Sequence, residues 1–319
     1  MTAPFSLQNK KVWVAGHNGM VGAATVRRLG REECDILTVD RGVLDLRRQK
    51  DVEDWLAVQK PDVVVLAAAK VGGIGANSTY PAEFVYDNLM IESNVIDAAY
   101  RQGVQKLLFL GSSCIYPREA AQPITEGALL SAKLEPTNEA YAVAKIAGIK
   151  LCQSYRRQYG CDFIAAMPCN LYGPGDTYHA EKSHVIPALM LKMKNAAEEG
   201  LDIVELWGTG TPLREFLYVD DLADALVFLL QNYSAEEHIN VGSGKEITIA
   251  DLARKIAAVV GYKGKIIFNS DYPDGTPRKL MDNSKIGALG WRARTAIDDG
   301  LCQSWQDYLV RTDVLKHAA

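Results

Sequence analysis

Three glycines at three-residue spacing lie between a short apolar run and a helical pattern near the start of the chain. Gly16, Gly19 and Gly22 follow Val12-Trp-Val-Ala, and a helical pattern then continues to Leu29. In such a loop the first glycine permits a tight turn, the second lets the backbone approach a pyrophosphate, and the third lets the helix pack on the strand. The helix N-terminus then faces the negative charge. The spacing therefore predicts a dinucleotide site at the first strand–helix junction.

Short β-branched runs alternate with longer helical patterns through the first half of the chain. The expected strands are Lys11–Ala15, Cys34–Asp40, Asp62–Ala69, Lys106–Ser113 and Asp162–Cys169. The expected helices are Met20–Leu29, Lys50–Gln59, Ala82–Gln102 and Ala140–Tyr159. Strands that are apolar nearly throughout are typical of a parallel sheet covered on both faces. The order predicts an α/β fold with a Rossmann-type, doubly wound parallel sheet.

The regular alternation weakens after Gly173, where we expect a smaller, interleaved C-terminal lobe that binds the substrate. A helix is expected to open at Arg214 and run through Leu230, with Asp220 or Asp221 as its N-cap. The other expected elements are helices at Ser183–Glu199, Ile249–Val260 and Thr295–Leu309 and strands at Ile203–Trp207, Ile239–Val241 and Lys265–Phe268. Residues 1–173, with return segments at about 214–242, would form the Rossmann domain. Residues 174–213 and 243–319 would form the substrate-binding lobe.

Composition excludes several classes of partner. The 319 residues carry a net charge of -4, so we expect no basic face for nucleic acid. No apolar run approaches the roughly 20 residues that span a bilayer, and the first residues do not resemble a secretory signal. The six cysteines lack zinc-type spacing. We therefore expect a cytoplasmic protein with free thiols, no metal and no membrane partner.

The end of the second expected strand leaves the choice of dinucleotide open. An acidic residue at this place usually binds the ribose hydroxyls of NAD, whereas an arginine accommodates the 2′-phosphate of NADP. The sequence has both, as Asp40 and Arg41.

Three polar residues indicate reduction chemistry. Tyr141 and Lys145 are four residues apart, so they share one face of a helix. An ammonium beside a phenol is expected to lower the phenol's pKa toward the working range of an acid-base group. Ser112 follows the fourth expected strand, where its hydroxyl can stabilise a developing alkoxide. Together with the glycine loop, these residues predict hydride transfer to a carbonyl.

From about Lys10 to Trp305 the chain resembles the GDP-L-fucose synthases, a family of extended short-chain dehydrogenases. Members of this family have a cysteine after the Gly-Ser-Ser motif, and this chain has Cys114 there. Many related families carry threonine at that position. The matching motifs are Gly111-Ser-Ser-Cys-Ile-Tyr-Pro, Leu134-Glu-Pro-Thr-Asn, Tyr141-Ala-x-Ala-Lys-Ile-Ala-Gly-Ile-Lys, Met167-Pro-x-Asn-Leu-Tyr-Gly-Pro, Ser183-His-Val-Ile-Pro-Ala, Trp207-Gly-Thr-Gly, Arg214-Glu-Phe-Leu-x-Val-Asp-Asp and Asp274-Gly-Thr-Pro-Arg-Lys.

The resemblance implies conversion of GDP-4-keto-6-deoxy-D-mannose to GDP-L-fucose. The 4-ketone acidifies the hydrogens at C3 and C5, so both centres can be inverted before NADPH reduces C4. Cys114 is then implied as the base and His184 as the acid, and both groups titrate near neutrality after modest shifts. Ser112, Tyr141 and Lys145 would serve the reduction.

The resemblance also implies the binding residues. For NADP these are Gly16, Asn18, Gly19, Met20, Val21, Gly22, Arg41, Asp45, Leu46, Ala68, Lys145, Pro168, Asn170, Leu171 and His184. For the GDP-sugar they are Lys192, Trp207, Arg214, Asp274 and Lys279. It implies a homodimer in which the helices at 82–102 and 140–159 pair across a two-fold axis. The chain departs from the family at Asn18, where some members have arginine, and at Cys169, where threonine is usual.

Three alternatives are open at this point. A GDP-L-colitose synthase would invert only C5 of a 3-deoxy substrate with the same residues. A sugar-nucleotide 4-epimerase or 4,6-dehydratase would retain NAD and carry threonine or Asp-Glu after the serine, in place of Cys114. A dinucleotide-sensing protein without activity would lack one of Ser112, Tyr141 or Lys145, and all three are present.

Overall fold

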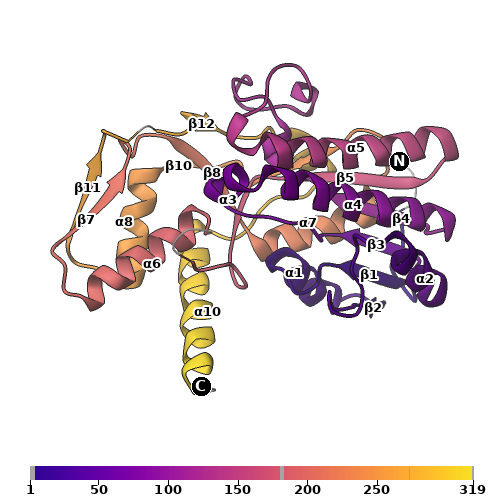
Figure 1. Cartoon of the computed structure of the whole chain (residues 1–319), viewed down its shortest axis with the longest axis horizontal. Coiled ribbons are helices and arrows are strands. Elements are labelled where there is room, and N and C mark those ends of the chain that lie inside the picture. The colour runs from indigo at the N-terminus through magenta and orange to yellow at the C-terminus, as the bar shows by residue number, and fades with distance from the viewer. Residues whose placement is uncertain (1–3, 180–182, 273, 318–319) are drawn as a thin grey trace.

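A six-stranded parallel sheet forms the centre of the larger lobe in the computed structural model, which describes residues 4–179, 183–272 and 274–317 (Figure 1). The strands run in the order β2-β1-β3-β4-β5-β9. Their bounds are β1 (Lys11–Ala15), β2 (Asp35–Leu37), β3 (Val63–Leu66), β4 (Lys106–Leu110), β5 (Asp162–Pro168) and β9 (Ile239–Val241). Every residue of β3 and β4 is buried, as expected for strands covered on both faces. The predicted fold class is confirmed.

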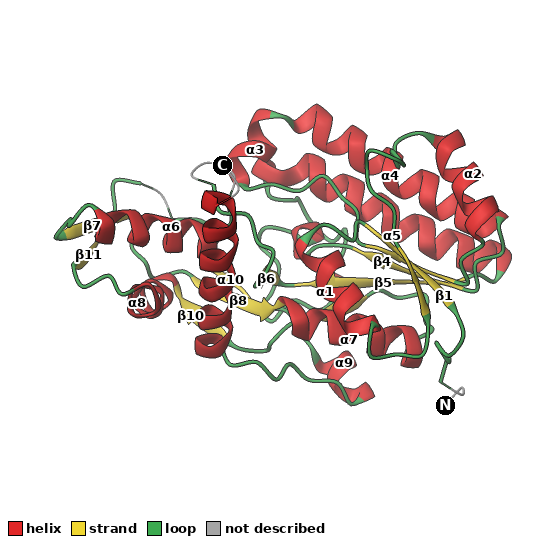
Figure 2. Cartoon of the chain, turned by 90° about the horizontal axis from the view of Figure 1, so that it is seen from below, coloured by secondary structure: helices red, strands yellow, loops and turns green. Residues whose placement is uncertain are grey.

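Helices cover both faces of this sheet (Figure 2). On one face α1 (Met20–Leu29) packs against α7 (Val219–Asn232). On the other face α4 (Pro81–Arg101) packs between α2 (Gln49–Gln59) and α5 (Glu139–Tyr159), and the short α3 (Ile74–Thr79) precedes α4. Four of these helices, α1, α2, α4 and α5, were predicted from the first half of the sequence. Each begins and ends within one residue of its predicted bounds.

The strand order reverses at β1, and this reversal positions the site. The chain passes from β1 through α1 to β2 on one side, then through α2 to β3 on the other side. Ligands of such sheets bind outside the carboxyl ends of the strands at the reversal point. There Gly16 has a φ of 91° and lies against Ala68, and a Cβ on Gly22 would approach the Gly16 carbonyl closer than 3.0 Å. Both positions therefore require glycine.

The smaller lobe has its own sheets and its own core. β8 (Leu213–Tyr218) pairs with β10 (Glu246–Thr248), β12 (Arg278–Lys279) and β6 (Asn170–Tyr172), while β7 (Ile203–Trp207) pairs in parallel with β11 (Lys265–Asn269). The helices are α6 (Val185–Glu198), α8 (Ile249–Val260) and α10 (Ile297–His317), the last of which extends away from the body in Figure 1. Side chains of α6 and α8, such as Met190 and Ile256, fill this core.

The predicted helix that opens at Arg214 is wrong in its first turn. Residues Leu213–Tyr218 form β8, because Phe216 and its two successors are buried and pair with β6 on one side. The helix α7 begins only at Val219 and its N-cap is Tyr218, so neither Asp220 nor Asp221 is the cap. Both aspartates lie in the first turn, where a negative charge favours the helix dipole.

The chain returns to the larger lobe after β12. Met281, Ile286 and Trp291 belong to the core of the larger lobe, and the helix α9 (Ser284–Leu289) packs near β9. Residues 243–319 therefore do not all pack in the smaller lobe. Within the described ranges, no helix is both long and apolar enough to cross a membrane.

Candidate active site

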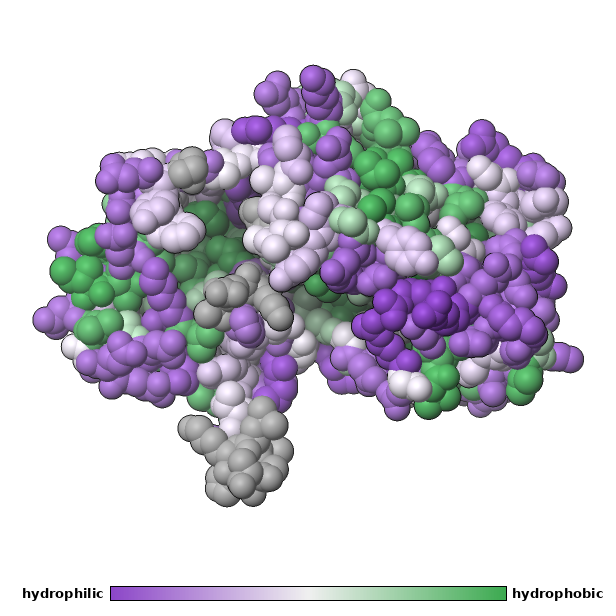
Figure 3. Space-filling view, viewed as in Figure 1, coloured by the Kyte–Doolittle hydropathy of each residue, from purple (hydrophilic) through white to green (hydrophobic). Residues whose placement is uncertain are grey.

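A cavity of about 1160 Å³ lies between the two lobes, at the carboxyl ends of β1, β3, β4 and β5. Figure 3 shows the corresponding recess, with hydrophobic residues on its floor. The volume exceeds the roughly 300–1,000 Å³ of usual small-molecule sites. The cavity is therefore large for a single small-molecule site. No cluster suited to a metal ion occurs among the described residues.

The cavity brings together nearly all of the predicted site residues. All five predicted catalytic residues line it, as do all of the predicted cofactor residues from the glycine loop, β2, β3 and the end of β5. Of the predicted substrate residues, Arg214, Asp274 and Lys279 line it. Lys192 and Trp207 lie outside the lining, and their roles stay predictions.

The glycine loop forms one end of the cavity. The loop is a tight turn in which the backbone amide of Gly19 donates a 3.0 Å hydrogen bond to the Gly16 carbonyl. The loop leads directly into α1 at Met20, so the unpaired amides of the first helical turn face the cavity. This geometry fits a pyrophosphate, as predicted.

Asp40 and Arg41 are placed differently with respect to the cavity. Arg41 lines it, whereas Asp40 is not among the lining residues. The amide Nδ2 of Asn18 donates a 2.6 Å hydrogen bond to Oδ1 of Asp40, and Nε2 of His17 lies 3.5 Å from the same oxygen. The glycine loop thus holds the acidic side chain outside the lining, whereas Arg41 is part of it. The donor set fits a dinucleotide with a 2′-phosphate.

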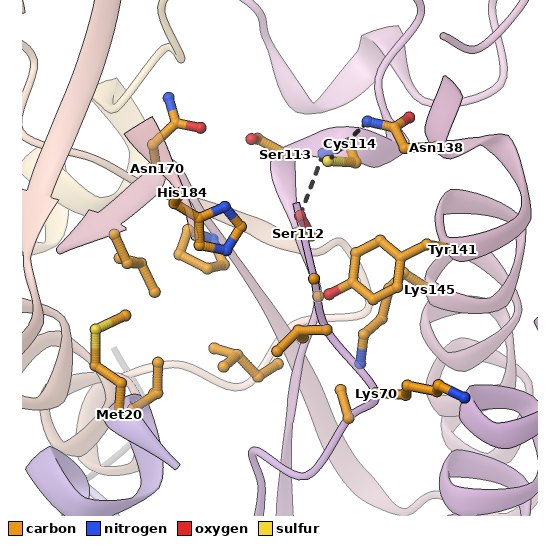
Figure 4. Close-up of a pocket in the computed structure, with 18 of the residues that line it drawn as sticks. Met20, Lys70, Ser112, Ser113, Cys114, Asn138, Tyr141, Lys145, Asn170 and His184 are labelled. Carbon is orange, nitrogen blue, oxygen red and sulfur yellow. Dashed lines mark hydrogen bonds between the residues drawn. The ribbon is translucent and has the colours of Figure 1, made fainter. Parts of the chain in front are cut away.

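Ser112, Tyr141 and Lys145 converge on the middle of the cavity (Figure 4). Ser112 follows β4 and caps a single turn of 3-10 helix at Ser113–Ile115, and Tyr141 lies in the first turn of α5. Burial raises the pKa of Tyr141, and the nearby Cys114 and Glu92 raise it further, whereas a hydrogen bond to Ser112 lowers it. The phenol therefore keeps its proton at neutral pH, which is the form that can donate one.

Lys145 lies beside two aromatic rings, one of them that of Tyr141. The ammonium lies 6.0 Å from the centroid of the Tyr141 ring and 4.6 Å from that of Phe109. Burial lowers the pKa of Lys145, and Glu92 opposes that shift. Burial is the largest influence on the pKa of Tyr141, and the effect of Lys145 on this phenol stays a prediction.

Cys114 and His184 face each other across the cavity (Figure 4). Cys114 lies in the turn after Ser112, and the Nδ2 of Asn138 donates a 3.4 Å hydrogen bond to its Sγ. His184 stands on the opposite wall as the N-cap of α6. Burial lowers the pKa of His184, so the neutral imidazole is favoured at neutral pH. A thiol and an imidazole thus border one space that also contains the Tyr141 hydroxyl.

Two lining residues were missed as functional candidates from the sequence. Asn138 was part of a matching motif but received no role, although its amide donor would stabilise negative charge on the Cys114 sulfur. Lys70 follows the carboxyl end of β3 and pairs with Glu83 and, at 3.3 Å, with Asp87. The position of Lys70 just after a central parallel strand is the sequence feature that could have identified it as a candidate site residue.

The far end of the cavity lies in the smaller lobe. Burial lowers the pKa of Arg214, and Asp274 opposes the shift. Asp274 accepts hydrogen bonds from the amide and hydroxyl of Thr209. Nearby, Trp207 is 68% exposed and stacks on Tyr272 with ring centroids 4.5 Å apart. The guanidinium and the exposed aromatic stack suit a pyrophosphate and a base ring, respectively.

Comparisons with known proteins agree with this geometry. The NAD dependent epimerase/dehydratase family matches residues 12–242. A GDP-L-fucose synthase of Sinorhizobium fredii is 56% identical over 96% of this chain and 97% of its own. A GDP-L-colitose synthase of Yersinia pseudotuberculosis is 37% identical over 94% and 98%. The solved structure of a GDP-L-fucose synthetase from Naegleria fowleri bound to NADP superposes with a TM-score of 0.90, at 27% identity, over 98% of each chain.

Proposed function

The chain belongs to the NAD-dependent epimerase/dehydratase family, and we propose that it converts GDP-4-keto-6-deoxy-D-mannose to GDP-L-fucose with NADPH. The observation that carries this proposal is the pairing of two functions in one cavity. Cys114 and His184 border the same space as Ser112 and Tyr141. The higher identity to a GDP-L-fucose synthase than to a GDP-L-colitose synthase supports the fucose product.

Epimerisation comes first, because it needs the ketone that reduction removes. The C4 carbonyl acidifies the hydrogens at C3 and C5, and Cys114 removes each as a proton from one face of the ring. The Ser112 hydroxyl donates a hydrogen bond to the resulting enolate oxygen. His184 delivers a proton to the opposite face. Before the second inversion the Cys114 thiol returns its proton to solvent and the His184 imidazole takes one up. Its pKa is lowered by burial, so the negative enolate is what favours the charged imidazolium.

Reduction then uses the same ketone. When bound, NADPH would supply the hydride that C4 receives. Tyr141 donates its proton to the C4 oxygen as negative charge develops there, and Ser112 holds that oxygen by a hydrogen bond. An alkoxide is a stronger base than a phenolate, so the transfer is favourable even though burial raises the pKa of Tyr141. Lys145 would bind the nicotinamide ribose through its ammonium.

The preference for NADPH over NADH follows from the second strand. Arg41 lines the cavity, and its guanidinium would pair with the 2′-phosphate. Asp40 would repel that phosphate if it turned inward, but Asn18 and His17 hold its carboxylate. Asp45 and Leu46 would complete the adenosine end. The preference therefore depends on a pair of residues that restrain Asp40 as well as on Arg41.

The GDP group would occupy the smaller lobe. Arg214, Asp274 and Lys279 are the lining residues that would bind the nucleotide. Trp207 and Lys192 would join them on closure around the ligand, since both are outside the cavity lining here. The Nζ of Lys192 now donates a hydrogen bond to the Glu205 carbonyl, which it would exchange for the ligand.

A homodimer in the cytoplasm is part of the proposal. Large hydrophobic residues are exposed on α4, α5 and the segment before α4, namely Tyr86 (60%), Val143 (44%) and Tyr80 (53%). Pairing α4 and α5 across a two-fold axis would bury such side chains. The six cysteines are all free, which suits a reducing compartment.

The test presents two keto sugars separately. With NADPH and GDP-4-keto-6-deoxy-D-mannose we expect GDP-L-fucose, identified by NMR of the product. The matched substrate is the analogue that lacks the 3-hydroxyl. A higher kcat/KM for that analogue would replace the proposal with colitose synthesis, and reduction without inversion would replace it with a simple reductase.

A further inference from the structure

The helix α4 carries an acidic side chain in the protein interior that no step above uses. Glu92 is 2% exposed, and neither Oε1 nor Oε2 has a hydrogen-bond partner in the described part of the chain. Most buried polar groups in folded proteins are hydrogen-bonded, and an uncompensated buried carboxylate is costly. A buried carboxylate without hydrogen bonds at position 92 therefore needs a physical reason.

The carboxylate points at α5, close to Lys145. A Cβ on Gly148 would lie closer than 3.0 Å both to Oε2 of Glu92 and to Cζ of Phe109. The Nζ of Lys145 lies 4.6 Å from the centroid of the same Phe109 ring. Glu92 and Lys145 therefore both lie next to one aromatic ring, without a direct hydrogen bond between them, and the missing side chain of Gly148 leaves room for the carboxylate. Lys145 itself is only 3% exposed.

The other groups around Glu92 offer no alternative counter-charge. The titratable groups that interact with it are Lys145, Tyr141 and Cys152, all on α5. β4 contributes the uncharged ring of Phe109. β3 consists of apolar residues only (Val63–Leu66), and the buried residues of α2 are Val52 and Leu56. Among these groups, Lys145 is the one that can carry a positive charge.

The electrostatics agree with this geometry. Burial raises the pKa of Glu92, and the positive charge of Lys145 opposes that shift. Burial lowers the pKa of Lys145, and Glu92 is the largest influence that raises it again. Each group thus favours the charged form of the other.

We propose that Glu92 is a positioning residue for the reduction: its carboxylate is the counter-charge that keeps the buried Lys145 protonated. This inference rests on the proposed role of Lys145 in holding the nicotinamide ribose beside Tyr141. Without the negative charge, Lys145 loses its proton at lower pH. The neutral amine has fewer donors for the ribose and no longer attracts the cofactor's negative charge. Glu92 touches neither substrate nor cofactor and acts through Lys145.

The experiment measures how NADPH binding and turnover depend on pH in Glu92→Gln. The amide is nearly the same size as the carboxylate but carries no charge. NADPH affinity is followed by fluorescence between pH 6 and 10, and kcat is measured over the same range with saturating substrates. We expect the alkaline limb of both profiles to move down by one pH unit or more. At a pH above the limb, this is a loss of about tenfold.

Three further variants separate the proposed role from a structural one. Glu92→Asp keeps the charge and should leave the limb near its wild-type position. Glu92→Met replaces the carboxylate with an apolar side chain of similar length, should fold even if the amide variant does not, and should show the same downward shift. In a Lys145→Met background, Glu92→Gln should cause no further loss of NADPH affinity.

The matched control is Glu126→Gln. Glu126 is also buried, but it accepts a hydrogen bond from the backbone N–H of Asn240 and pairs with Lys285. This variant should lower the melting temperature and leave both alkaline limbs in place.

Two results would overturn the inference: unchanged limbs in folded Glu92→Gln and Glu92→Met, or losses that add to those of Lys145→Met. Failure of the proposed function would look different. The wild type would then form no fucose product, while its NADPH-binding profile would still report on Glu92 and Lys145.

Discussion

Removing the amide of Asn18 should weaken the preference for NADPH over NADH. Asn18 donates a 2.6 Å hydrogen bond to the carboxylate of Asp40, and the Asp40 side chain is 68% exposed. In Asn18→Ala the Asp40 side chain can turn toward the 2′-position of the cofactor. There it would repel a 2′-phosphate and accept a hydrogen bond from the 2′-hydroxyl of NADH.

The size of the effect follows from the exposure of Asp40. A phosphate of charge about −1.5 to −2 at roughly 5 Å from a carboxylate, in a dielectric near that of water, is destabilised by about 1.5 kcal/mol. Screening over a Debye length of about 8 Å removes roughly half of this at physiological salt. The NADPH-to-NADH selectivity should therefore fall about three- to fourfold at 0.15 M salt, and more at low salt.

The assay is a set of dissociation constants for NADPH and NADH by cofactor fluorescence. Measurements on wild type, Asn18→Ala, Asp40→Ala and the double variant form a double-mutant cycle. Asn18→Ala should change the ratio in the wild-type background and leave it unchanged in the Asp40→Ala background. The reasoning is refuted if Asn18→Ala lowers both affinities equally, or if its effect on the ratio persists without Asp40.

Three further predictions concern the reacting groups and the contact between α4 and α5. Cys114→Ser should slow epimerisation at least about 100-fold while direct reduction at C4 persists, as NMR of the sugar products would reveal; full-rate fucose formation would contradict the base assignment. Tyr141→Phe should lower NADPH oxidation by about 100-fold or more and leave solvent exchange at C3 and C5 intact, and loss of both would implicate misfolding or a shared role. Gly148→Ala should lower the free energy of unfolding by about 1–3 kcal/mol, because its Cβ would collide with Glu92 and Phe109. Gly30→Ala is the control for urea denaturation, since a Cβ there meets nothing closer than 3.4 Å, and equal losses in the two variants would contradict the packing argument.

The larger lobe could be predicted from the sequence because its signals are local. Apolar runs predicted buried parallel strands, and the glycine spacing located the turn between β1 and α1. The Ser112, Tyr141 and Lys145 set was also local, since a strand end and one helical turn place these side chains. The extra strand β8 was missed because its sequence continues without a break into α7. Only pairing with β6 and β10 decides its conformation.

The remaining features of the site depend on contacts between distant segments. Asn138 reaches Cys114 across 24 positions, and Asn18 reaches Asp40 across 22. Glu92 lies on a different helix from Lys145, and its carboxylate is accommodated only because position 148 is glycine. No periodicity or spacing rule encodes these pairs. The position of Trp207 outside the cavity is equally a matter of how the smaller lobe packs.

Deuterium incorporation tests the central claim most directly, because it reports on both uses of the ketone in a single product. The wild-type protein is incubated with GDP-4-keto-6-deoxy-D-mannose and NADPH in deuterated water, and the product is analysed by NMR and mass spectrometry. We expect GDP-L-fucose with deuterium at C3 and C5 and protium at C4, since the hydride comes from the cofactor. A reduced product with protium at both C3 and C5 would contradict proton exchange by Cys114 and His184.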